Sequence, residues 1–154
     1  MKYQFDDIAG LQAIVSETWS DWGKEFEVTQ EVINQFADLT GDHYFLHVDK
    51  EAAAKGPFKT TIAHGFLTLA LMPRLTIPNW HEIVGFKTMV NYGSNKLRFT
   101  GIVPSGSKIH MRTRCISVTP APKGPGTQVT SEFAIHVVGQ DRPALLYEMI
   151  ILYM

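Results

Sequence analysis

The sequence predicts one α+β domain, residues 1–154, in which a long antiparallel sheet wraps around a buried central helix. In the first half of the chain, apolar residues recur at helical spacing. From Ile83 onward they alternate with polar residues instead, as in half-buried strands. Between the two halves, residues 65–72 (GFLTLALM) are almost entirely apolar, which is typical of a helix buried on nearly all sides.

The elements before the sheet are expected from apolar spacing and from capping residues. Residues 6–17 predict an amphipathic helix, and residues 23–28 predict a short strand. Thr29 is the expected N-cap of a second helix that Gly41 ends, and Asp49 is the expected cap of a helix over Lys50 to Lys55. The central helix is expected to begin near His64 or Gly65 and to end or kink at Pro73, because proline removes a helix hydrogen bond.

The second half predicts five strands, several of them separated by turns rich in glycine and proline. Their expected bounds are residues 86–92, 96–103, 108–118, 129–138 and 145–153. Trp19, Trp22 and Trp80 are expected to pack or to lie at an interface. The only cysteine, Cys115, lies in a β-branched stretch and is interpreted as a small strand residue.

Composition excludes several classes of function. A hydrophobic content of 45% and a charged content of 19% are values of a globular domain. The net charge is −1 and the basic residues are scattered, which disfavours a nucleic-acid partner. The apolar runs are too short to span a bilayer, so no membrane partner is expected. A single cysteine favours a reducing compartment, and we expect a cytoplasmic protein.

Asp42 and His47 are candidate catalytic residues, because they place an acid and an imidazole five residues apart in a loop between two helical patterns. Either residue could instead be structural, Asp42 as a turn cap and His47 as a hydrogen-bonded core residue. His43 and His47, four residues apart, could share a zinc ion. The metalloprotease pattern requires glutamate where Tyr44 stands, and no third ligand is evident. We therefore expect no metal.

Gly65 stands where the central helix should begin, so its amide is one of the unpaired donors at the helix N-terminus. Such an amide suits an oxygen that acquires negative charge. Glycine could equally serve close packing of the helix on the sheet. His64, the preceding residue, could contact substrate or be a core histidine bonded to the backbone.

Several motifs together resemble the MaoC-like hot-dog proteins, within them the branch that contains nodulation protein N and the R-specific enoyl-CoA hydratases. The similar stretches cover nearly the whole chain, and the pairing of GD-x4-H with AHG is the most specific part. They are SDW (Ser20 to Trp22), VTQE (Val28 to Glu31), FADLTGDHYFLHVDKEAA, IAHGFLTL and NYGSNKLRF (Asn91 to Phe99).

The resemblance implies a hot-dog fold, usually built as a homodimer, that hydrates trans-2-enoyl-CoA to (R)-3-hydroxyacyl-CoA or catalyses the reverse dehydration. Asp42 and His47 occupy the family's acid and imidazole positions, which act on water and on the substrate's alpha carbon. Gly65 occupies the position whose amide binds the thioester carbonyl. The expected partner is an acyl-CoA or an acyl-carrier thioester, and no cofactor is expected beyond that substrate.

One departure from the family pattern concerns the active-site loop. Many relatives read GD-x-N-P-x-H or carry glutamine and an aromatic residue, whereas this chain has Tyr44 and Phe45. A phenol can donate and accept a hydrogen bond with a different reach, so Tyr44 is a candidate substrate-binding residue or an apolar wall. Asn95 and Arg98 are further substrate-binding candidates, with a solvated edge strand as the alternative.

Two other functions remain open at this point. A hot-dog thioesterase usually depends on a carboxylate from the central helix or a neighbouring strand, and GFLTLALM contains neither aspartate nor glutamate. A non-catalytic acyl-thioester binding protein is the second alternative, and Tyr44 is the feature that favours it.

Overall fold

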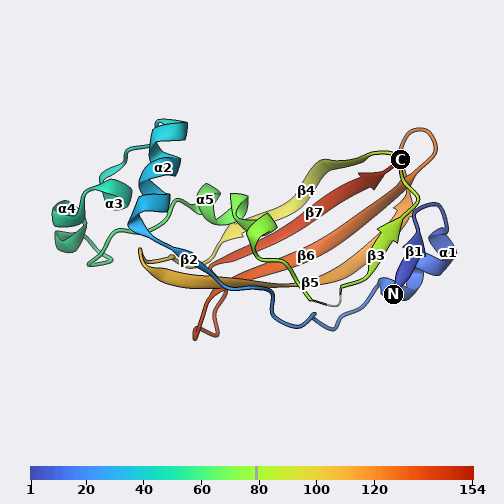
Figure 1. Ribbon diagram of the computed structural model, residues 1–154, viewed down its shortest axis with the longest axis horizontal. Helices are drawn as coiled ribbons and strands as arrows, with labels where there is room; N and C mark the ends of the chain where they lie inside the picture. The colour runs from blue at the N-terminus through green and yellow to red at the C-terminus, as the bar shows by residue number, and fades with distance from the viewer. Residues whose placement is uncertain (79) are drawn as a thin grey trace.

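A five-stranded antiparallel sheet forms the body of the protein, with its strands in the spatial order β2-β5-β6-β7-β4 (Figure 1). The computed structural model describes residues 1–78 and 80–154. The strands of this sheet are β2 (Phe26–Val28), β4 (Met89–Phe99), β5 (Ser107–Pro120), β6 (Thr127–Val137) and β7 (Leu145–Tyr153). A second, parallel sheet pairs β1 (Lys2–Gln4) with β3 (Glu82–Val84). The predicted α+β class with a long antiparallel sheet is therefore confirmed.

The helices precede the long strands, and three of them form a lobe beyond one end of the sheet (Figure 1). The helical elements are α1 (Ile8–Leu11), η1 (Gln12–Ile14), α2 (Gln30–Thr40), α3 (Phe45–Val48), α4 (Lys50–Lys55), α5 (Gly65–Ala70) and η2 (Met72–Arg74). Helices α2, α3 and α4 make up the lobe, α5 lies between the lobe and the long strands, and both termini lie at the opposite end (Figure 1). Within residues 1–78 and 80–154, no helix has the length and apolarity needed to cross a membrane.

The capping residues predicted for the lobe are confirmed. The Thr29 hydroxyl accepts a hydrogen bond from the Val32 N–H at 3.2 Å, and the Asp49 carboxylate caps α4 in the same way. Helix α2 ends at Gly41, whose N–H donates to the Ala37 carbonyl at 2.8 Å. The φ angle of Gly41 is +79°, a left-handed conformation that glycine adopts without steric cost. This turn directs the chain from α2 into the loop that carries the candidate acid.

The main core lies between α5 and one face of the sheet. Leu67 and Leu71 from the α5 region belong to one buried cluster with Met111, Ile135 and Leu145 from the strands. Each such side chain contributes roughly 1.5–3 kcal/mol when it is removed from water. The central helix is thus fixed to the sheet through one of its faces, and with it the position of the helix N-terminus.

The prediction that the central helix is buried on nearly all sides is wrong for the single chain. Leu67 is 5% exposed, but its neighbour Phe66 is 64% exposed. The sheet covers one face of α5, whereas the Phe66 ring meets the Phe99 ring edge-on at 5.5 Å and is otherwise largely open. The α-helix ends at Ala70, and a 3-10 turn containing Pro73 follows, so the predicted helix end at this proline is confirmed.

Residues 86–92 and 96–103, predicted as two strands, contain one strand instead. Strand β4 pairs with β7 from Met89 to Phe99 and passes through both regions. The register shifts between Asn91 and Gly93 and again between Ser94 and Lys96. A bulge accommodates one extra residue and lets the pairing continue beyond it, so the glycine does not end the strand. The helix predicted over residues 6–17 is likewise shorter, because the chain becomes extended at Val15.

The segment from residue 16 to residue 23, here called the edge segment, runs along one side of β5 before the short strand β2 takes over. Its backbone donates hydrogen bonds from Ser20 to the Thr113 carbonyl at 2.8 Å and from Gly23 to the Met111 carbonyl at 2.7 Å. Strand β5 therefore has a partner along much of this side.

Two tryptophans of the edge segment interleave with side chains of β5. Trp22 stacks on His110 with ring centroids 3.8 Å apart and an angle of 3° between the planes. The guanidinium carbon of Arg112 lies 4.8 Å from the Trp22 ring and 4.9 Å from the Trp19 ring, and that of Arg114 lies 4.7 Å from Trp19. Alternate residues of β5 thus hold the two indoles between them. The packing role predicted for Trp19 and Trp22 is confirmed.

Candidate active site

The turn after α2 and the short helix α3 bring Asp42 and His47 together, as the sequence predicts. Each residue offers a side-chain donor atom, and together with His64 these atoms all lie within 4.8 Å of one another. Helix α3 was not predicted, since the region was interpreted as a loop. The helical turn shortens the path between the acid and the imidazole, because a helix rises only about 1.5 Å per residue.

The main chain of Tyr44 connects this acid to this imidazole. Its N–H donates to Oδ1 of Asp42 at 3.3 Å, and its carbonyl accepts a hydrogen bond from the His47 N–H at 2.9 Å. The Tyr44 side chain is 56% exposed, and its ring lies 6.2 Å from that of His47. The predicted site residue therefore lies beside the pair, and its described contacts to the pair are largely those of its backbone.

The orientation of the His47 ring is fixed by the backbone of another segment. Its Nδ1 donates a hydrogen bond to the Ile62 carbonyl at 2.8 Å, which assigns the proton to Nδ1. In the neutral ring Nε2 is then a free acceptor, and it can take a proton from water or substrate. The Gln30 side chain donates to the His47 carbonyl at 2.7 Å, and it also accepts from the Thr61 hydroxyl.

His64 lies beneath His47 and is buried, with 3% of its surface exposed. The two imidazoles stack with ring centroids 3.8 Å apart and planes inclined by 24°. Nε2 of His64 donates to the backbone carbonyl of Asp42 at 2.9 Å. Burial lowers the pKa of His64 below its ordinary value, and the nearby His47 lowers it further, so the neutral form is favoured.

Gly65 is the first residue of α5, as predicted, and directly follows His64. Within residues 1–78 and 80–154, its N–H finds no hydrogen-bond acceptor, as expected at the first position of a helix. A Cβ atom at this position would lie 2.7 Å from the Phe99 ring. Close packing of the helix on β4 therefore requires glycine here, and the free amide remains available to a ligand.

Asn95 and Arg98 lie on the edge strand β4 and are both exposed. Asn95 falls in the second bulge of that strand, and Arg98 donates to the Leu97 carbonyl at 3.1 Å. In the part of the chain that the structure describes, neither side chain hydrogen-bonds to Asp42 or His47. Their predicted contact with substrate stays a prediction.

His64 places a third possible ligand atom beside Asp42 and His47, a trio that differs from the pair of His43 and His47 considered in the sequence. His43, considered as a ligand, points elsewhere and contacts Asp38 at 2.8 Å. The planes of His47 and His64 are close to parallel, so their in-plane lone pairs do not converge as a tetrahedral zinc site requires. Each of these two rings also uses one nitrogen to donate a hydrogen bond to a backbone carbonyl. This geometry suits proton transfer better than metal binding, and the absence of a metal stays a prediction.

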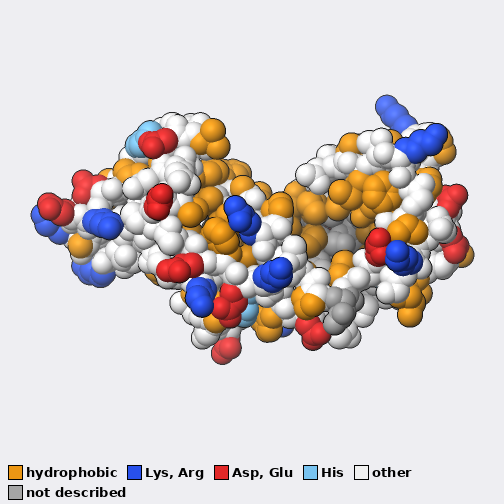
Figure 2. Space-filling view, in the orientation of Figure 1, with side chains coloured by type: hydrophobic (Ala, Val, Ile, Leu, Met, Phe, Trp, Pro, Cys, Tyr) orange, Lys and Arg blue, Asp and Glu red, His pale blue; other side chains and the backbone are white. Residues whose placement is uncertain are grey.

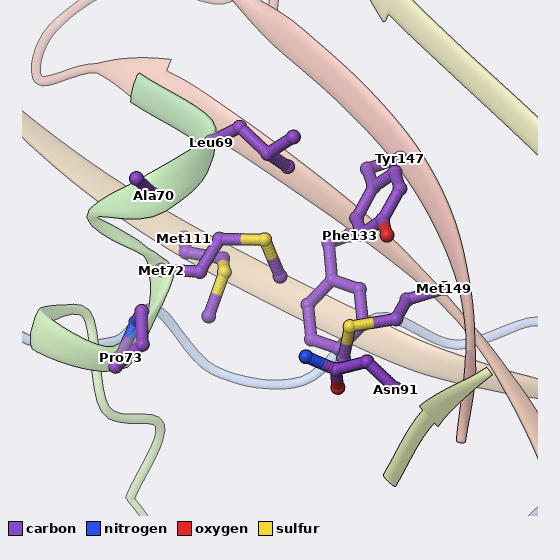
Figure 3. A pocket seen from close by; sticks show the side chains of 9 residues that line it. All are labelled: Leu69, Ala70, Met72, Pro73, Asn91, Met111, Phe133, Tyr147 and Met149. Carbon is purple, nitrogen blue, oxygen red and sulfur yellow. The ribbon is translucent and has the colours of Figure 1, made fainter. Parts of the chain in front are cut away.

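Two cavities adjoin the central helix, and Figure 2 shows hydrophobic side chains around a hollow on this face of the molecule. A cavity of about 620 Å³ lies at the N-terminal end of α5, where Gly65, Phe66 and Phe99 line it. A second cavity, of about 470 Å³, lies between the C-terminal end of α5 and the sheet (Figure 3). Its lining consists of Leu69, Ala70, Met72, Pro73, Asn91, Met111, Phe133, Tyr147 and Met149.

Sequence reasoning missed the residues that hold the pair in place. Gln30 lies in the first turn of α2, and nothing in the sequence shows that its side chain reaches His47. The acceptor of the His47 ring is the Ile62 backbone, which no side-chain pattern can identify. Only tertiary structure brings these segments together.

The comparisons with known proteins agree with one another. A family described as MaoC like domain matches residues 17–132. The 3-hydroxyacyl-thioester dehydratase Z of Mycobacterium tuberculosis (strain ATCC 25618 / H37Rv) is 45% identical over 152 residues, 97% of each chain. Nodulation protein N of Rhizobium leguminosarum bv. viciae is 38% identical over 128 residues, 82% of this chain and 76% of that one.

The fold also matches solved structures. The R-hydratase PhaJ1 of Pseudomonas aeruginosa, in its unliganded form, is similar with a TM-score of 0.69 and 22% sequence identity. This match covers 97% of the present chain and 86% of that chain. The likeness confirms the predicted hot-dog fold.

Proposed function

The chain belongs to the MaoC-like domain family, and from this premise we propose that it hydrates trans-2-enoyl thioesters to (R)-3-hydroxyacyl thioesters, or catalyses the reverse dehydration. The observation that carries the proposal is the convergence of Asp42 and His47, with the Nε2 acceptor of His47 left free. The relative that is 45% identical over nearly its whole length is named as a 3-hydroxyacyl-thioester dehydratase, which supports the same reaction class.

The chemistry requires what this pair offers. Water adds its oxygen to C3 and a proton to C2 while electrons move onto the thioester oxygen. An acid and an imidazole that touch one water molecule can remove one proton and supply another, an effect typically worth about 10²–10⁴-fold in rate. Asp42 and His47 act as a unit in this proposal, and the direction of each proton transfer is left open between them.

The Gly65 amide is proposed to bind the thioester oxygen. Negative charge develops on that oxygen as water adds, and a preorganised amide donor stabilises it by about 3–4 kcal/mol in comparable enzymes. The amide lies one residue from His64, which contacts both Asp42 and His47. The three proposed catalytic groups are therefore connected through one residue, Asp42 and His47 through its side chain and Gly65 through its backbone.

The cavity between the end of α5 and the sheet is proposed to hold the acyl chain. Its lining is mostly apolar and includes three methionines, which adapt to ligands of different shape. The thioester can be carried by CoA or by a carrier protein. Addition of water is redox-neutral, so the reaction requires no redox cofactor.

We also propose that two copies form a homodimer through β4. This strand is the outer member of the sheet, and unpaired strand edges readily join a second strand. Large apolar side chains on it and on α5 are exposed, among them Met89, Tyr92, Phe99 and Phe66 at 50%, 55%, 46% and 64%. A two-fold related copy would cover them. Sedimentation equilibrium tests this, and a monomer at micromolar concentration would contradict it.

A cytoplasmic location rests on the single cysteine and stays a proposal.

The decisive experiment follows the enoyl-thioester absorbance of crotonyl-CoA and of longer enoyl-CoAs with purified protein, with free thiol measured in parallel. We expect loss of the enoyl band without thiol release, and loss of activity in both Asp42→Asn and His47→Ala. Thiol release would instead indicate a thioesterase. Binding without turnover at any chain length would indicate a non-catalytic acyl-thioester binding protein.

A further inference from the structure

The side chain of His64 contacts both members of the proposed acid–base pair. Its Nε2 donates to the Asp42 carbonyl at 2.9 Å, and its ring stacks on that of His47 at 3.8 Å. The backbone of His64 continues directly into Gly65, whose amide is the proposed oxyanion donor. The three proposed catalytic groups come from three segments of the chain, and His64 touches or adjoins each of them.

The backbone that carries His64 is itself held firmly. The N–H of Ile62 donates to the Leu46 carbonyl at 2.9 Å, and the N–H of Ala63 donates to the Val103 carbonyl at 2.8 Å. The His64 carbonyl accepts from the Thr68 N–H at 3.1 Å within α5. These bonds reach both the active-site loop and the body of the protein. The backbone that carries the His64 ring is therefore fixed in position.

His64 is poorly suited to exchange protons itself. Donation to a carbonyl requires a proton on Nε2, so Nδ1 is an acceptor, and this atom is buried without a partner in the described part of the chain. A second positive charge stacked on His47 would be repelled. The ring therefore remains neutral while His47 exchanges a proton.

His64 also has little surface with which to bind substrate. Only 3% of it is exposed, and it lines neither of the two cavities beside α5. This burial argues against the substrate contact that the sequence suggested for it. A neutral, buried side chain that touches two reacting residues acts through them.

We propose that His64 is a positioning residue. It holds the Asp42 loop and the His47 ring in a fixed geometry relative to the Gly65 amide. The inference rests on the proposed hydratase function. Its physical basis is the narrow tolerance of proton transfer: a displacement of about 1 Å in a catalytic group can cost about 100-fold in rate. Without His64, Asp42 is exposed at a turn, where its carboxylate accepts from the Tyr44 N–H and its own N–H donates to the Thr40 hydroxyl.

Two substitutions separate the two contacts of His64. His64→Phe keeps an aromatic ring on His47 but removes the donor to Asp42, whereas His64→Gln keeps an amide donor near the position of Nε2 but removes the stack. We expect kcat to fall by about 10- to 100-fold in His64→Phe with little change in KM, and His64→Gln to recover part of the loss. Thr68→Val is the matched control, because Thr68 is equally buried and bonds only to the His64 carbonyl.

A double-mutant cycle distinguishes positioning from a general loss of structure. If His64 acts through Asp42, adding His64→Phe to Asp42→Asn lowers the residual activity little further, because the carboxylate that His64 positions is already neutralised. Additive losses, or a kcat of His64→Phe within about threefold of the wild type, would overturn the proposal. So would a Thr68→Val variant that loses as much kcat as His64→Phe. A wild type without any hydration activity would instead refute the proposed function.

A measurement without substrate tests the geometry directly. In imidazole-nitrogen NMR spectra at neutral pH, His64 should show the neutral tautomer with its proton on Nε2. The Cε1 proton of His47 should be shifted upfield by the stacked ring, and this shift should be lost in His64→Gln. A charged His64, or a His47 signal unaffected by the substitution, would contradict the positioning role of His64, whether or not the protein is active.

Discussion

Replacing Gly65 by proline removes the proposed oxyanion donor and little else from the backbone. Proline is tolerated at the first position of a helix, where its missing N–H has no intrahelical partner. The residue before a proline prefers ψ between about +120° and +160°. His64 already has ψ of 140°. The main chain can therefore accept proline here without a change of conformation.

The side chain of the new residue is the complication, and the structure shows how to control for it. A Cβ at position 65 meets the Phe99 ring at 2.7 Å, whereas carbon atoms pack best at about 3.5–4.0 Å. The ring would have to withdraw by about 1 Å, and overpacking of this kind costs typically 1–3 kcal/mol. Phe99→Ala removes the clash, so both Gly65→Ala and Gly65→Pro should be made in that background.

The comparison between the two double variants then isolates the amide. Both carry a Cβ and both lack the Phe99 ring, but only the proline variant lacks the N–H. We expect its kcat for crotonyl-CoA hydration to be about 10²–10³-fold lower, equivalent to about 2.7–4 kcal/mol. Steady-state kinetics measures this difference, and circular dichroism checks the fold of each variant. Equal kcat values would refute the assignment of Gly65 as oxyanion donor and leave close packing as the reason for this glycine.

Three further predictions concern stability and substrate choice. Burial lowers the pKa of His81 to about 4 from 6.5, with a smaller contribution from the N-terminal charge. The unfolded state therefore binds the proton first, and we expect roughly 1–2 kcal/mol of stability, fully present above pH 6.5, to be lost as the pH falls toward 4, a figure reduced for the solvent that screens this partly exposed ring. Trp22→Ala should lower the free energy of unfolding by about 2–3 kcal/mol in urea titrations, because the stack on His110 and the contact with Arg112 are both lost. Ala70→Phe should reduce turnover of long enoyl-CoAs far more than that of crotonyl-CoA, because it fills the cavity beside α5.

Each of these has a control. The pH dependence should be weaker in His81→Phe, and an unchanged slope would mean that other groups produce it. Trp80→Ala, which changes a tryptophan outside the edge segment, shows whether the effect of Trp22→Ala is specific to the interleaved stack. An equal loss for long and short substrates in Ala70→Phe would show that the cavity does not hold the acyl chain.

The sequence predicts those parts of the fold that depend on local interactions. Thr29 and Gly41 bound α2 because a hydroxyl cap and a left-handed glycine act within one turn of helix. The failures are at positions where distant segments decide the outcome. Pairing with β7 carries β4 through its bulges near Gly93, and the missing cover over Phe66 depends on what lies opposite α5.

The same distinction applies to the site. The sequence pairs Asp42 with His47 because both lie in one short loop, and it places Gly65 at a helix start. It cannot show that His64 folds beneath His47, nor that Ile62 supplies the acceptor for the ring. Both contacts join residues that are 15 or more positions apart in the chain, and one partner in each is a backbone carbonyl or a ring face.

Tyr44 departs from the family pattern, and substitutions at this position test whether the active-site loop is still functional. Its backbone N–H binds Asp42 and its carbonyl binds the N–H of His47, whereas its side chain is 56% exposed. We therefore expect Tyr44→Phe, which removes only the hydroxyl, to leave kcat within about threefold of the wild type. Tyr44→Pro keeps the backbone angle, since φ is −57° here, but removes the N–H that holds Asp42.

We expect Tyr44→Pro to lose at least about tenfold in kcat, because the carboxylate loses a hydrogen bond that orients it. Steady-state hydration of crotonyl-CoA by both variants measures the contrast. The reverse order, with the phenylalanine variant inactive and the proline variant active, would assign the role to the phenol. Position 44 would then act through its side chain, and its departure from the family pattern would alter the chemistry of the site. If the backbone carries the role, the departure is compatible with a working hydratase, because asparagine and tyrosine offer the same N–H and carbonyl to the pair.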